Sequence, residues 1–383
     1  MKYVDEFRDG NAARAVAGAI ARELQPGRRY NLMEFCGGHT HAIARYGIRT
    51  LLPPAVNFIH GPGCPVCVMP IGRIDSAIAL AQRPEVILCT YGDTLRVPAS
   101  RGASLQAAKA RGADVRMVYS CTDALAIARQ NPDRQVVFFA IGFETTTPPS
   151  AVAILAAAAE GLENFSVFCN HVLTPAAIQN LLESREVRDL ADVPLDGFIG
   201  PSHVSTIIGS RPYEFFAEEY AKPVVIAGFE PLDVLQAVWM LVRQLNEGRA
   251  EVQNQFSRAV TREGNRKAQR LVAEVFELRE SFEWRGLGEV PYSALRIRPG
   301  YRAFDAEERF GITYRAVADN KACECGAILR GVRHPRDCKV FGTVCTPQNP
   351  IGSCMVSSEG ACAAHYTYGR FQDSALVPAG QGA

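Results

Sequence analysis

The feature of this sequence that most constrains its fold is an alternation between short apolar runs and alanine-rich stretches of helical periodicity. The apolar runs are typical of strands and lie at residues 30–35, 56–59, 86–88, 115–119, 136–141, 165–168, 198–199 and 224–227. The helical stretches lie at residues 75–81, 104–110, 122–129 and 150–160. Strands that alternate with helices predict α/β architecture with doubly wound parallel sheets.

The chain is long enough for three domains, and we expect two of them to be doubly wound parallel-sheet domains. Residues 28–112 would form domain I, with the CGGHTH and CPVC loops, and residues 113–230 would form domain II, with the GFETT and PSHVS loops. From residue 284 the chain is rich in Gly, Pro, Arg and Cys and poor in periodicity. Residues 1–27 plus 231–383 would therefore form a helical and irregular domain whose fold a metal could hold together.

Nearly every apolar run ends in a loop of glycine, proline or polar residues, such as FCGGHTH, HGPGCPVC, IGFETTTPP and GPSHVS. In open α/β sheets, ligands bind in the crevice at the carboxyl ends of the strands. We therefore expect these loops to form the functional site.

The charge balance excludes some classes of partner. The chain has 41 basic and 40 acidic residues, a formal net charge of +1, which gives no electrostatic reason to expect nucleic acid or an anionic membrane surface as the main partner. The apolar runs are too short to span a bilayer, and the amino-terminal residues do not resemble a signal peptide. We expect a soluble protein of the reducing cytosol, with a cytoplasmic location.

Twelve cysteines in a large chain of this kind indicate metal binding or redox chemistry more than structural disulfides. Three of them, Cys89, Cys121 and Cys169, are scattered, and we expect them to be small buried core residues. The others gather in two regions that carry recognisable motifs.

The first motif is Cys36-Gly37-Gly38-His39-Thr40-His41. The two glycines allow a tight turn that leaves the thiol of Cys36 accessible. If a helix begins near Thr40, its amides would favour the thiolate and lower the pKa of Cys36. His39 would add positive charge or transfer a proton.

The second motif is Gly61-Pro62-Gly63-Cys64-Pro65-Val66-Cys67. Two sulfurs at this spacing close a small disulfide or bind one side of a metal. The proline-rich loop favours a redox pair, and half of a zinc site is the competing interpretation, weakened because the chain has no second CxxC.

Two further strand-end loops contain Glu144 and His203. The loop around Glu144 is rich in threonine but lacks the lysine and spacing of a phosphate-binding P-loop. Glu144 and His203 are candidate acid–base or supporting residues.

The third cysteine group lies near the carboxyl end and includes Cys325, Cys338, Cys345 and Cys362, with Cys323 and Cys354 as extra candidates. Four thiolates from an irregular segment suit a [4Fe–4S] cluster or a structural zinc ion. The spacing does not decide between the two.

Taken together, these motifs resemble the HypD family of [NiFe]-hydrogenase maturation proteins. The resemblance rests on CGGHTH, GPGCPVC, GFETT, PSHVS, WRGLG and the tail CG…C…C…SSEGAC, and it runs nearly the whole length of the chain.

The resemblance implies an assembly scaffold with redox activity and not a conventional turnover enzyme. With a small HypC-type chaperone it would build the Fe(CN)2CO group, with cyanide from a HypE-type donor, for the hydrogenase large subunit. Cys36 would hold the Fe(II) that carries CN and CO, while Cys64 and Cys67 would be the redox-active pair. His39 and Glu144 would line the cleft.

The resemblance also implies a [4Fe–4S] cluster held by Cys325, Cys338, Cys345 and Cys362, which would supply electrons to the cysteine pair. Two alternatives remain from the residues themselves. One is a stand-alone thiol–disulfide oxidoreductase with an iron–sulfur electron source, and the other is a zinc-stabilised interaction module.

Overall fold

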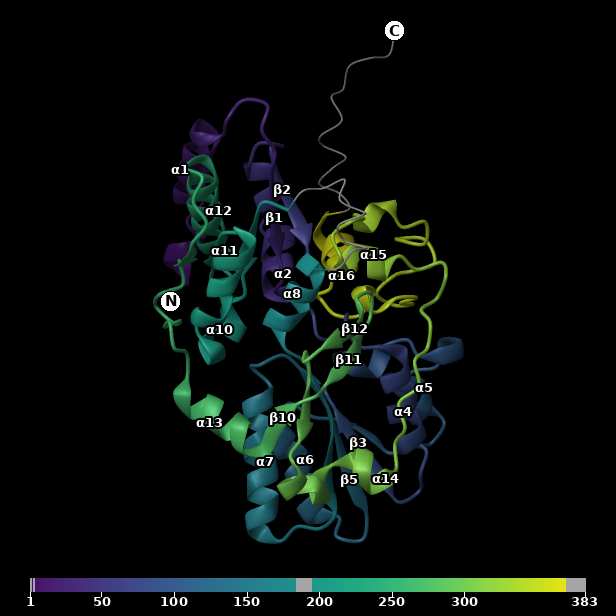
Figure 1. Cartoon of the computed structure of the whole chain (residues 1–383). Coiled ribbons are helices and arrows are strands. Elements are labelled where there is room, and N and C mark those ends of the chain that lie inside the picture. Colours follow the sequence, from purple (N-terminus) through teal and green to yellow (C-terminus); the bar gives the residue numbers. More distant parts are fainter. Residues whose placement is uncertain (1, 3, 184–194, 370–383) are drawn as a thin grey trace.

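The structure is a computed structural model that describes residue 2, residues 4–183 and residues 195–369. It contains two parallel sheets with helices on both faces, and a cysteine-rich irregular region near the carboxyl end (Figure 1). The predicted fold class, α/β with doubly wound parallel sheets and an irregular cysteine-rich part, is therefore confirmed. In the part of the chain that the structure describes, no helix is both long and apolar enough to cross a membrane.

The first sheet has the strand order β2-β1-β7-β8-β9, and all of its pairings are parallel. Its strands are β1 (Tyr30–Glu34), β2 (Val56–His60), β7 (Gly197–Gly200), β8 (Val224–Ile226) and β9 (Val252–Asn254). Alternate residues of a strand point to opposite faces, so each face packs on different helices. One face packs against α1 (Gly10–Glu23), α2 (Gly37–Arg45) and α12 (Pro231–Asn246), and the other against α8 (Thr174–Glu183) and α11 (Glu214–Tyr220).

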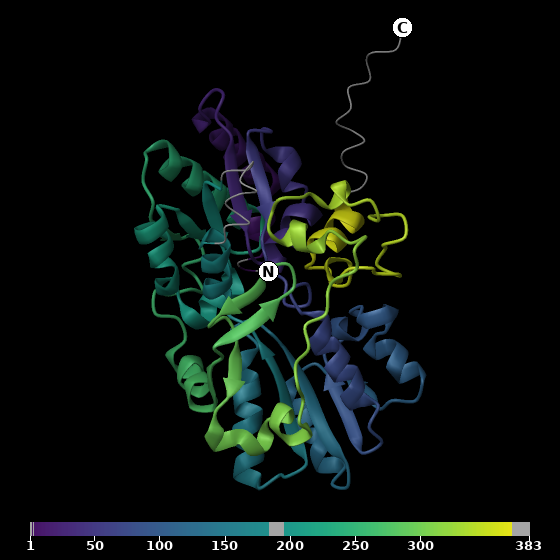
Figure 2. The same cartoon turned by 45° about the vertical axis from the view of Figure 1, so that its right-hand side comes forward.

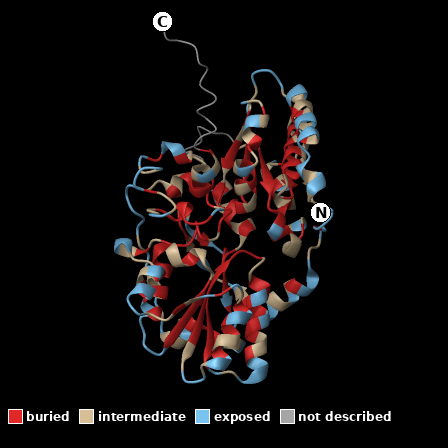
Figure 3. Cartoon of the chain, turned by 180° about the vertical axis from the view of Figure 1, so that it is seen from behind, coloured by how far each residue is buried: buried red, intermediate tan, exposed pale blue. Residues whose placement is uncertain are grey.

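The second sheet has the order β4-β3-β5-β6 and is also parallel throughout. Its strands are β3 (Val86–Thr90), β4 (Val115–Met117), β5 (Gln135–Gly142) and β6 (Phe165–His171). One face packs on α4 (Ile71–Ala81) and α5 (Leu105–Ala110), the other on α6 (Cys121–Gln130) and α7 (Thr147–Glu160). The strands are buried, as Figure 3 shows, and Cys89, Cys121 and Cys169 lie in this core as predicted.

The strand pairings cross the contiguous boundaries that the sequence suggested. The segments 28–112 and 113–230 each contribute strands to both sheets. In the first sheet β1 of the first segment pairs with β7 of the second, and in the second sheet β3 of the first segment pairs with β4 and β5 of the second. The chain begins the first sheet, completes the second and then returns to the first. Residues 231–254, expected in the third domain, provide α12 and β9 of the first sheet.

The remaining elements cover the two sheets. Short helices α3 (Ile48–Leu51), α10 (Ser202–Ile208), α13 (Arg266–Val275) and α14 (Ala306–Phe310) lie among them, with two antiparallel ribbons, β10 (Phe276–Leu278) with β13 (Leu295–Ile297) and β11 (Ser281–Trp284) with β12 (Gly288–Pro291). The cysteine-rich unit, residues 323–362, contains α15 (Cys325–Leu329) and α16 (Ala361–Ala364). It packs beside α2, with which α16 is in contact (Figure 2).

Candidate functional site

A cleft of about 560 Å³ lies where strand ends of both sheets face the cysteine-rich unit. We call it the central cleft. Its wall includes Cys36 after β1, Pro65 and Val66 of the CPVC loop, and His203 at the start of α10. Glu359 closes it from the cysteine-rich unit. The prediction that the strand-end loops meet at one site is confirmed for these residues.

Cys36 is the residue before α2, which begins at Gly37, three residues earlier than expected. Amides of Gly38 and His39 donate hydrogen bonds to the Cys36 side chain and lower the pKa of its thiol. The expectation of an accessible thiol with a lowered pKa is nevertheless wrong. Cys36 is 7% exposed, and burial, followed by the nearby carboxylate of Glu359, raises its pKa above the ordinary value.

The CPVC loop and the Cys36 turn are in direct backbone contact. Gly37 N donates a hydrogen bond to Gly63 O at 2.9 Å. A Cβ atom on Gly63 would overlap the backbone of Phe35 and Cys36, so glycine is the residue that allows this close approach. The two motifs that sequence separates by a helix and a strand are thus one structural unit.

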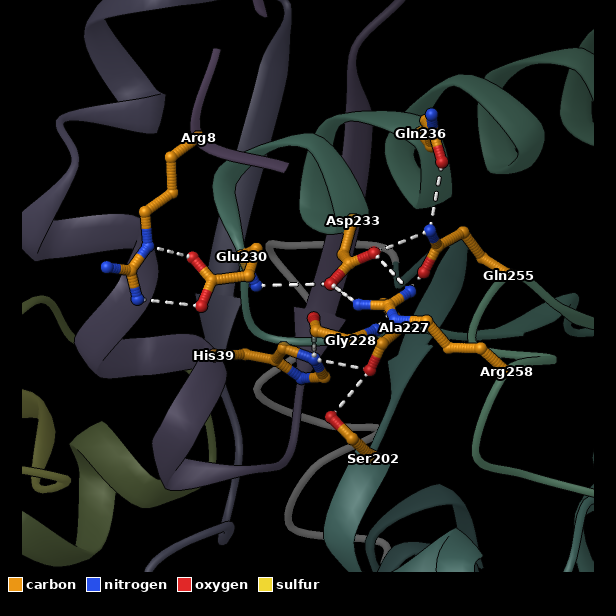
Figure 4. A network of polar contacts seen from close by, with 10 residues as sticks. All are labelled: Arg8, His39, Ser202, Ala227, Gly228, Glu230, Asp233, Gln236, Gln255 and Arg258. Carbon is orange, nitrogen blue, oxygen red and sulfur yellow. Dashed lines mark hydrogen bonds and ion pairs between the residues drawn. The ribbon is translucent and has the colours of Figure 1, made fainter. Parts of the chain in front are cut away.

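His39 faces away from the central cleft, contrary to the prediction that it lines it. The residue is fully buried, and its Nε2 donates to the carbonyl oxygens of Ala227 at 3.0 Å and Gly228 at 3.1 Å (Figure 4). Because both partners only accept, Nε2 carries a proton. Burial lowers the pKa of His39 to about 4, so the ring is neutral near neutral pH. His39 therefore ties α2 to the end of β8 and adds no positive charge.

A hydrogen-bond network continues from that strand end into α12 (Figure 4). Ser202 Oγ donates to the same Ala227 carbonyl at 2.6 Å. Asp233 is fully buried and pairs with Arg258 at 2.6 Å, and Glu230 pairs with Arg8 at the surface. This network fixes the β8–α12 connection behind the site.

His203 lies in the central cleft as expected. Its ring contacts Phe229 at a centroid distance of 4.4 Å. Phe229 also contacts the ring of His39, at a centroid distance of 4.9 Å. Burial lowers the pKa of His203, so the neutral ring is the dominant form near neutral pH.

Glu144 does not line the central cleft, although its neighbours Phe143 and Thr145 do. Its carboxyl group accepts hydrogen bonds from Thr174 N at 2.9 Å and Thr174 Oγ1 at 3.0 Å, at the start of α8. Burial raises the pKa of Glu144 to about 7. The GFETT loop thus uses this carboxyl to hold α8, which is a structural contact.

Cys64 and Cys67 form a disulfide, and both are buried. Ser353 Oγ of the cysteine-rich unit donates to Cys67 O at 2.7 Å, and the Cys67 sulfur lies 4.0 Å from Ser353 O. The disulfide is therefore placed between the central cleft, which its own Pro65 and Val66 line, and the cysteine-rich unit.

The cysteine-rich unit brings the predicted ligands together only in part. The side chain of Cys325 contacts those of Cys323, Cys354 and Cys362, while Cys345 is near Cys338 and Cys323. In the described part of the chain, no three His, Cys, Asp or Glu side chains surround a point as ligands of a single metal ion would. The donor set is nevertheless entirely thiol, the donor type that suits iron–sulfur clusters and zinc.

Sequence reasoning did not single out Glu359, which belongs to the SSEGAC motif. A Cβ atom on Gly37 would overlap the Glu359 side chain, and the Glu359 carboxylate acts on the Cys36 thiol. The rim residues Met117 and Tyr119, 50% and 87% exposed, were likewise assigned only to a strand. The sequence offered one sign for these residues. Glu359 lies within the SSEGAC motif, and Met117 and Tyr119 lie at the end of a predicted strand.

Fold and site define a class of protein: a cysteine-rich α/β protein with a buried thiol, a disulfide and a thiol-lined unit around one cleft. A family model described as "HypD: Hydrogenase formation hypA family" matches residues 11–369. The chain therefore belongs to the HypD family, several of whose matched curated members are named hydrogenase maturation factors.

Individual relatives are similar over their whole length. The hydrogenase maturation factor HypD of Cupriavidus necator is 69% identical over 379 residues, which cover 99% of this chain and 100% of the relative. That of Rhizobium leguminosarum bv. viciae is 69% identical over 373 residues, 97% of each chain. That of Escherichia coli K12 is 46% identical over 379 residues, 98% of this chain and 100% of the relative.

Proposed function

We propose that this hydrogenase maturation factor is a scaffold on which the Fe(CN)2CO group is assembled. Cys36 would hold the ferrous ion in the central cleft, and a HypC-type chaperone would supply a further ligand. A HypE-type donor would deliver the cyanide, and the finished group would pass to the hydrogenase large subunit. The observation that carries this proposal is the position of the Cys36 thiol in a cleft of about 560 Å³ beside the CPVC loop.

The surroundings of Cys36 support an iron-binding role. Burial keeps the thiol protonated and protected while no metal is bound. When iron binds, the thiol proton is released and the sulfur becomes a soft anionic ligand, which suits iron that also carries cyanide and carbon monoxide. The two amide donors of the first turn of α2 stabilise that anionic sulfur.

We further propose that Cys64 and Cys67 are a redox pair. Their reduction consumes two electrons and two protons and releases two thiols next to the cleft. Cys325, Cys338, Cys345 and Cys362 would hold a [4Fe–4S] cluster, which when bound supplies single electrons. The contact between Ser353 and Cys67 joins the cysteine-rich unit to the disulfide.

A stand-alone thiol–disulfide oxidoreductase fits the site less well. Such an enzyme needs a sulfur that a protein substrate can reach, whereas Cys64 is 4% exposed and Cys67 is fully buried. We place the protein in the reducing cytosol, because ten of its twelve cysteines are free thiols.

Infrared spectroscopy of the protein, purified without oxygen in complex with its HypC-type chaperone, tests the scaffold role. The wild-type complex is expected to give cyanide and carbonyl stretching bands, and Cys36→Ala to lose them. Cys89→Ala, which removes a buried core sulfur from β3 that does not itself line the central cleft, is the matched control and should keep them. A Cys36→Ala complex with normal bands would refute the proposal.

A further inference from the structure

A second hollow of about 660 Å³ borders the cysteine-rich unit and shares no lining residue with the central cleft. Its walls come from the loop 98–104, the connection 317–320 and the turn 348–352. Cys323 and Cys325 form part of its lining. We call it the arginine pocket, for Arg96, Arg101 and Arg285.

The arginine pocket has an excess of positive charge. Three guanidinium groups line it and Asp319 is its only carboxylate. The remaining polar side chains are neutral hydrogen-bonding groups: Ser100, Ser104, Gln106, Asn320, Gln348 and Asn349. A concave surface of this size and composition suits a small anionic molecule.

Arg285 provides the specific reason to expect a ligand. It is 4% exposed, and its Nε lies 3.1 Å from Asp319 Oδ1, but among the described residues its buried Nη2 has no hydrogen-bond partner. A buried guanidinium donor without an acceptor is costly, because it has lost water and gained nothing. Arg285 is held in place by its backbone, whose N–H donates to Val68 O at 2.8 Å.

The rim of the pocket is also fixed before any ligand binds. Ser100 donates from its backbone and its hydroxyl to Asp75 at 3.0 and 2.5 Å, which anchors the loop that carries Arg101. Arg96 donates to the carbonyl oxygens of Pro347 and Val356. It therefore adds positive charge to the pocket and joins its own segment to the cysteine-rich unit. Arg101 is exposed at the mouth.

A comparable hollow elsewhere lacks this feature. It measures about 670 Å³ at the amino-terminal end of the second sheet and is lined by Arg83, Arg111 and Arg134 with Asp114. There Arg134 donates to the backbone carbonyls of Glu85 and Val86 and lies 3.7 Å from Asp114. No buried guanidinium nitrogen of that hollow is without a partner among the described residues. Positive charge alone therefore does not distinguish the arginine pocket.

We propose that the arginine pocket binds a small oxyanion with two or more carboxylate or phosphate groups. One group accepts from Arg285 Nη2 at the floor, and another is held by Arg101 at the mouth. The bound anion would lie beside Cys323 and Cys325, which also line the pocket.

Isothermal titration calorimetry of the full-length protein, purified without oxygen, tests this with two probes, pyrophosphate for phosphate chemistry and citrate for carboxylate chemistry. Saturable binding of one probe identifies the ligand class. Arg285→Gln is expected to weaken that binding by about tenfold or more, because a charged hydrogen bond is lost. Arg101→Gln should weaken it by about threefold, and Arg111→Gln, in the control hollow, should leave it unchanged.

The outcomes separate a ligand site from other uses of Arg285. If Arg285 only offsets the charge of a bound cluster, neither pyrophosphate nor citrate gives saturable binding, and Arg101→Gln does not change the titration. That result overturns the proposal. Equal weakening by Arg111→Gln, or abolition by sodium chloride at matched ionic strength, would also overturn it. Because Arg101 is exposed, its variant remains informative even if Arg285→Gln does not fold.

Discussion

At the scale of single residues, Cys36 is subject to two opposed influences. Burial and the Glu359 carboxylate favour the thiol, while the amides of Gly38 and His39 favour the thiolate. Burial and the carboxylate dominate in the free protein, and the proposed bound cation would reverse the balance because it would compensate the charge on sulfur. Sequence reasoning anticipated the helix amides but not the burial, since Glu359 is 323 positions away in the chain.

Beneath this cysteine lies a buried carboxyl, Glu34. Its Oε1 lies 2.5 Å from Thr40 Oγ1 and 2.5 Å from His60 Nδ1. Burial raises the pKa of Glu34 to about 8 and lowers that of His60 to about 3. Near neutral pH the Glu34 carboxyl is therefore protonated and the His60 ring is neutral.

This pair makes stability depend on pH. In the folded protein Glu34 keeps its proton up to about pH 8 and in the unfolded chain only to about 4.5, whereas His60 keeps its proton up to about pH 3 when folded and 6.5 when unfolded. The two effects cancel between about pH 4.5 and 6.5. From about pH 6.5 to 8 the folded protein binds more protons than the unfolded chain, so the free energy of unfolding falls as pH rises. We expect Glu34→Gln to lose this fall in stability. Between pH 5 and pH 8, its free energy of unfolding should rise relative to that of wild type by about 2 kcal/mol or more. Urea denaturation at the two pH values measures it.

The exposed Glu219→Gln is the control for that experiment and should follow the wild-type slope. An unchanged slope in Glu34→Gln would mean that another group carries the pH dependence.

At the scale of elements, the Cys36 turn and the CPVC loop depend on glycines that permit close contacts. Gly63 lies against the turn at Phe35 and Cys36, and Gly38 lies against the ring of Phe229. Sequence reasoning marked these glycines as turn residues, but the contact between two distant loops could not be read from either loop alone.

Gly63→Ala is therefore expected to push the CPVC loop away from Cys36 and to lower the free energy of unfolding by about 1–3 kcal/mol. Gly300→Ala, where an added Cβ meets no atom within 4 Å, is the matched control and should have little effect. Denaturant unfolding of both variants gives the comparison. Equal stabilities would show that the two loops can separate at no cost.

At the scale of the whole molecule, local pattern predicted the strands but not their order. The runs that became β1 to β8 were visible because each is apolar and bounded by loop residues. Which strands share a sheet depends on contacts such as Leu32 with Gly197, far apart in sequence. The same distance explains why the interleaving of the two sheets was not visible in the contiguous segments, and why Glu359 was not placed at the site.

The cysteine-rich unit has few regular elements, so we expect a metal to contribute much of its order. Hydrogen exchange measured by mass spectrometry, on protein with its metal and after chelation, should show faster exchange in residues 323–362 of the stripped form. Peptides from β5 are the internal control and should be unchanged, because that strand is central in the second sheet. Identical exchange in both forms would show that the unit is self-sufficient.

The interleaved course of the chain has a consequence for biosynthesis. Cys36 leaves the ribosome early. The strands β7 and β8 of its sheet follow only after half of the 383-residue chain has been translated, and Glu359, which closes its cleft, follows near the end. A truncated or stalled nascent polypeptide therefore exposes the cysteine without the walls that surround it. The cleft around Cys36 is therefore completed only late in synthesis.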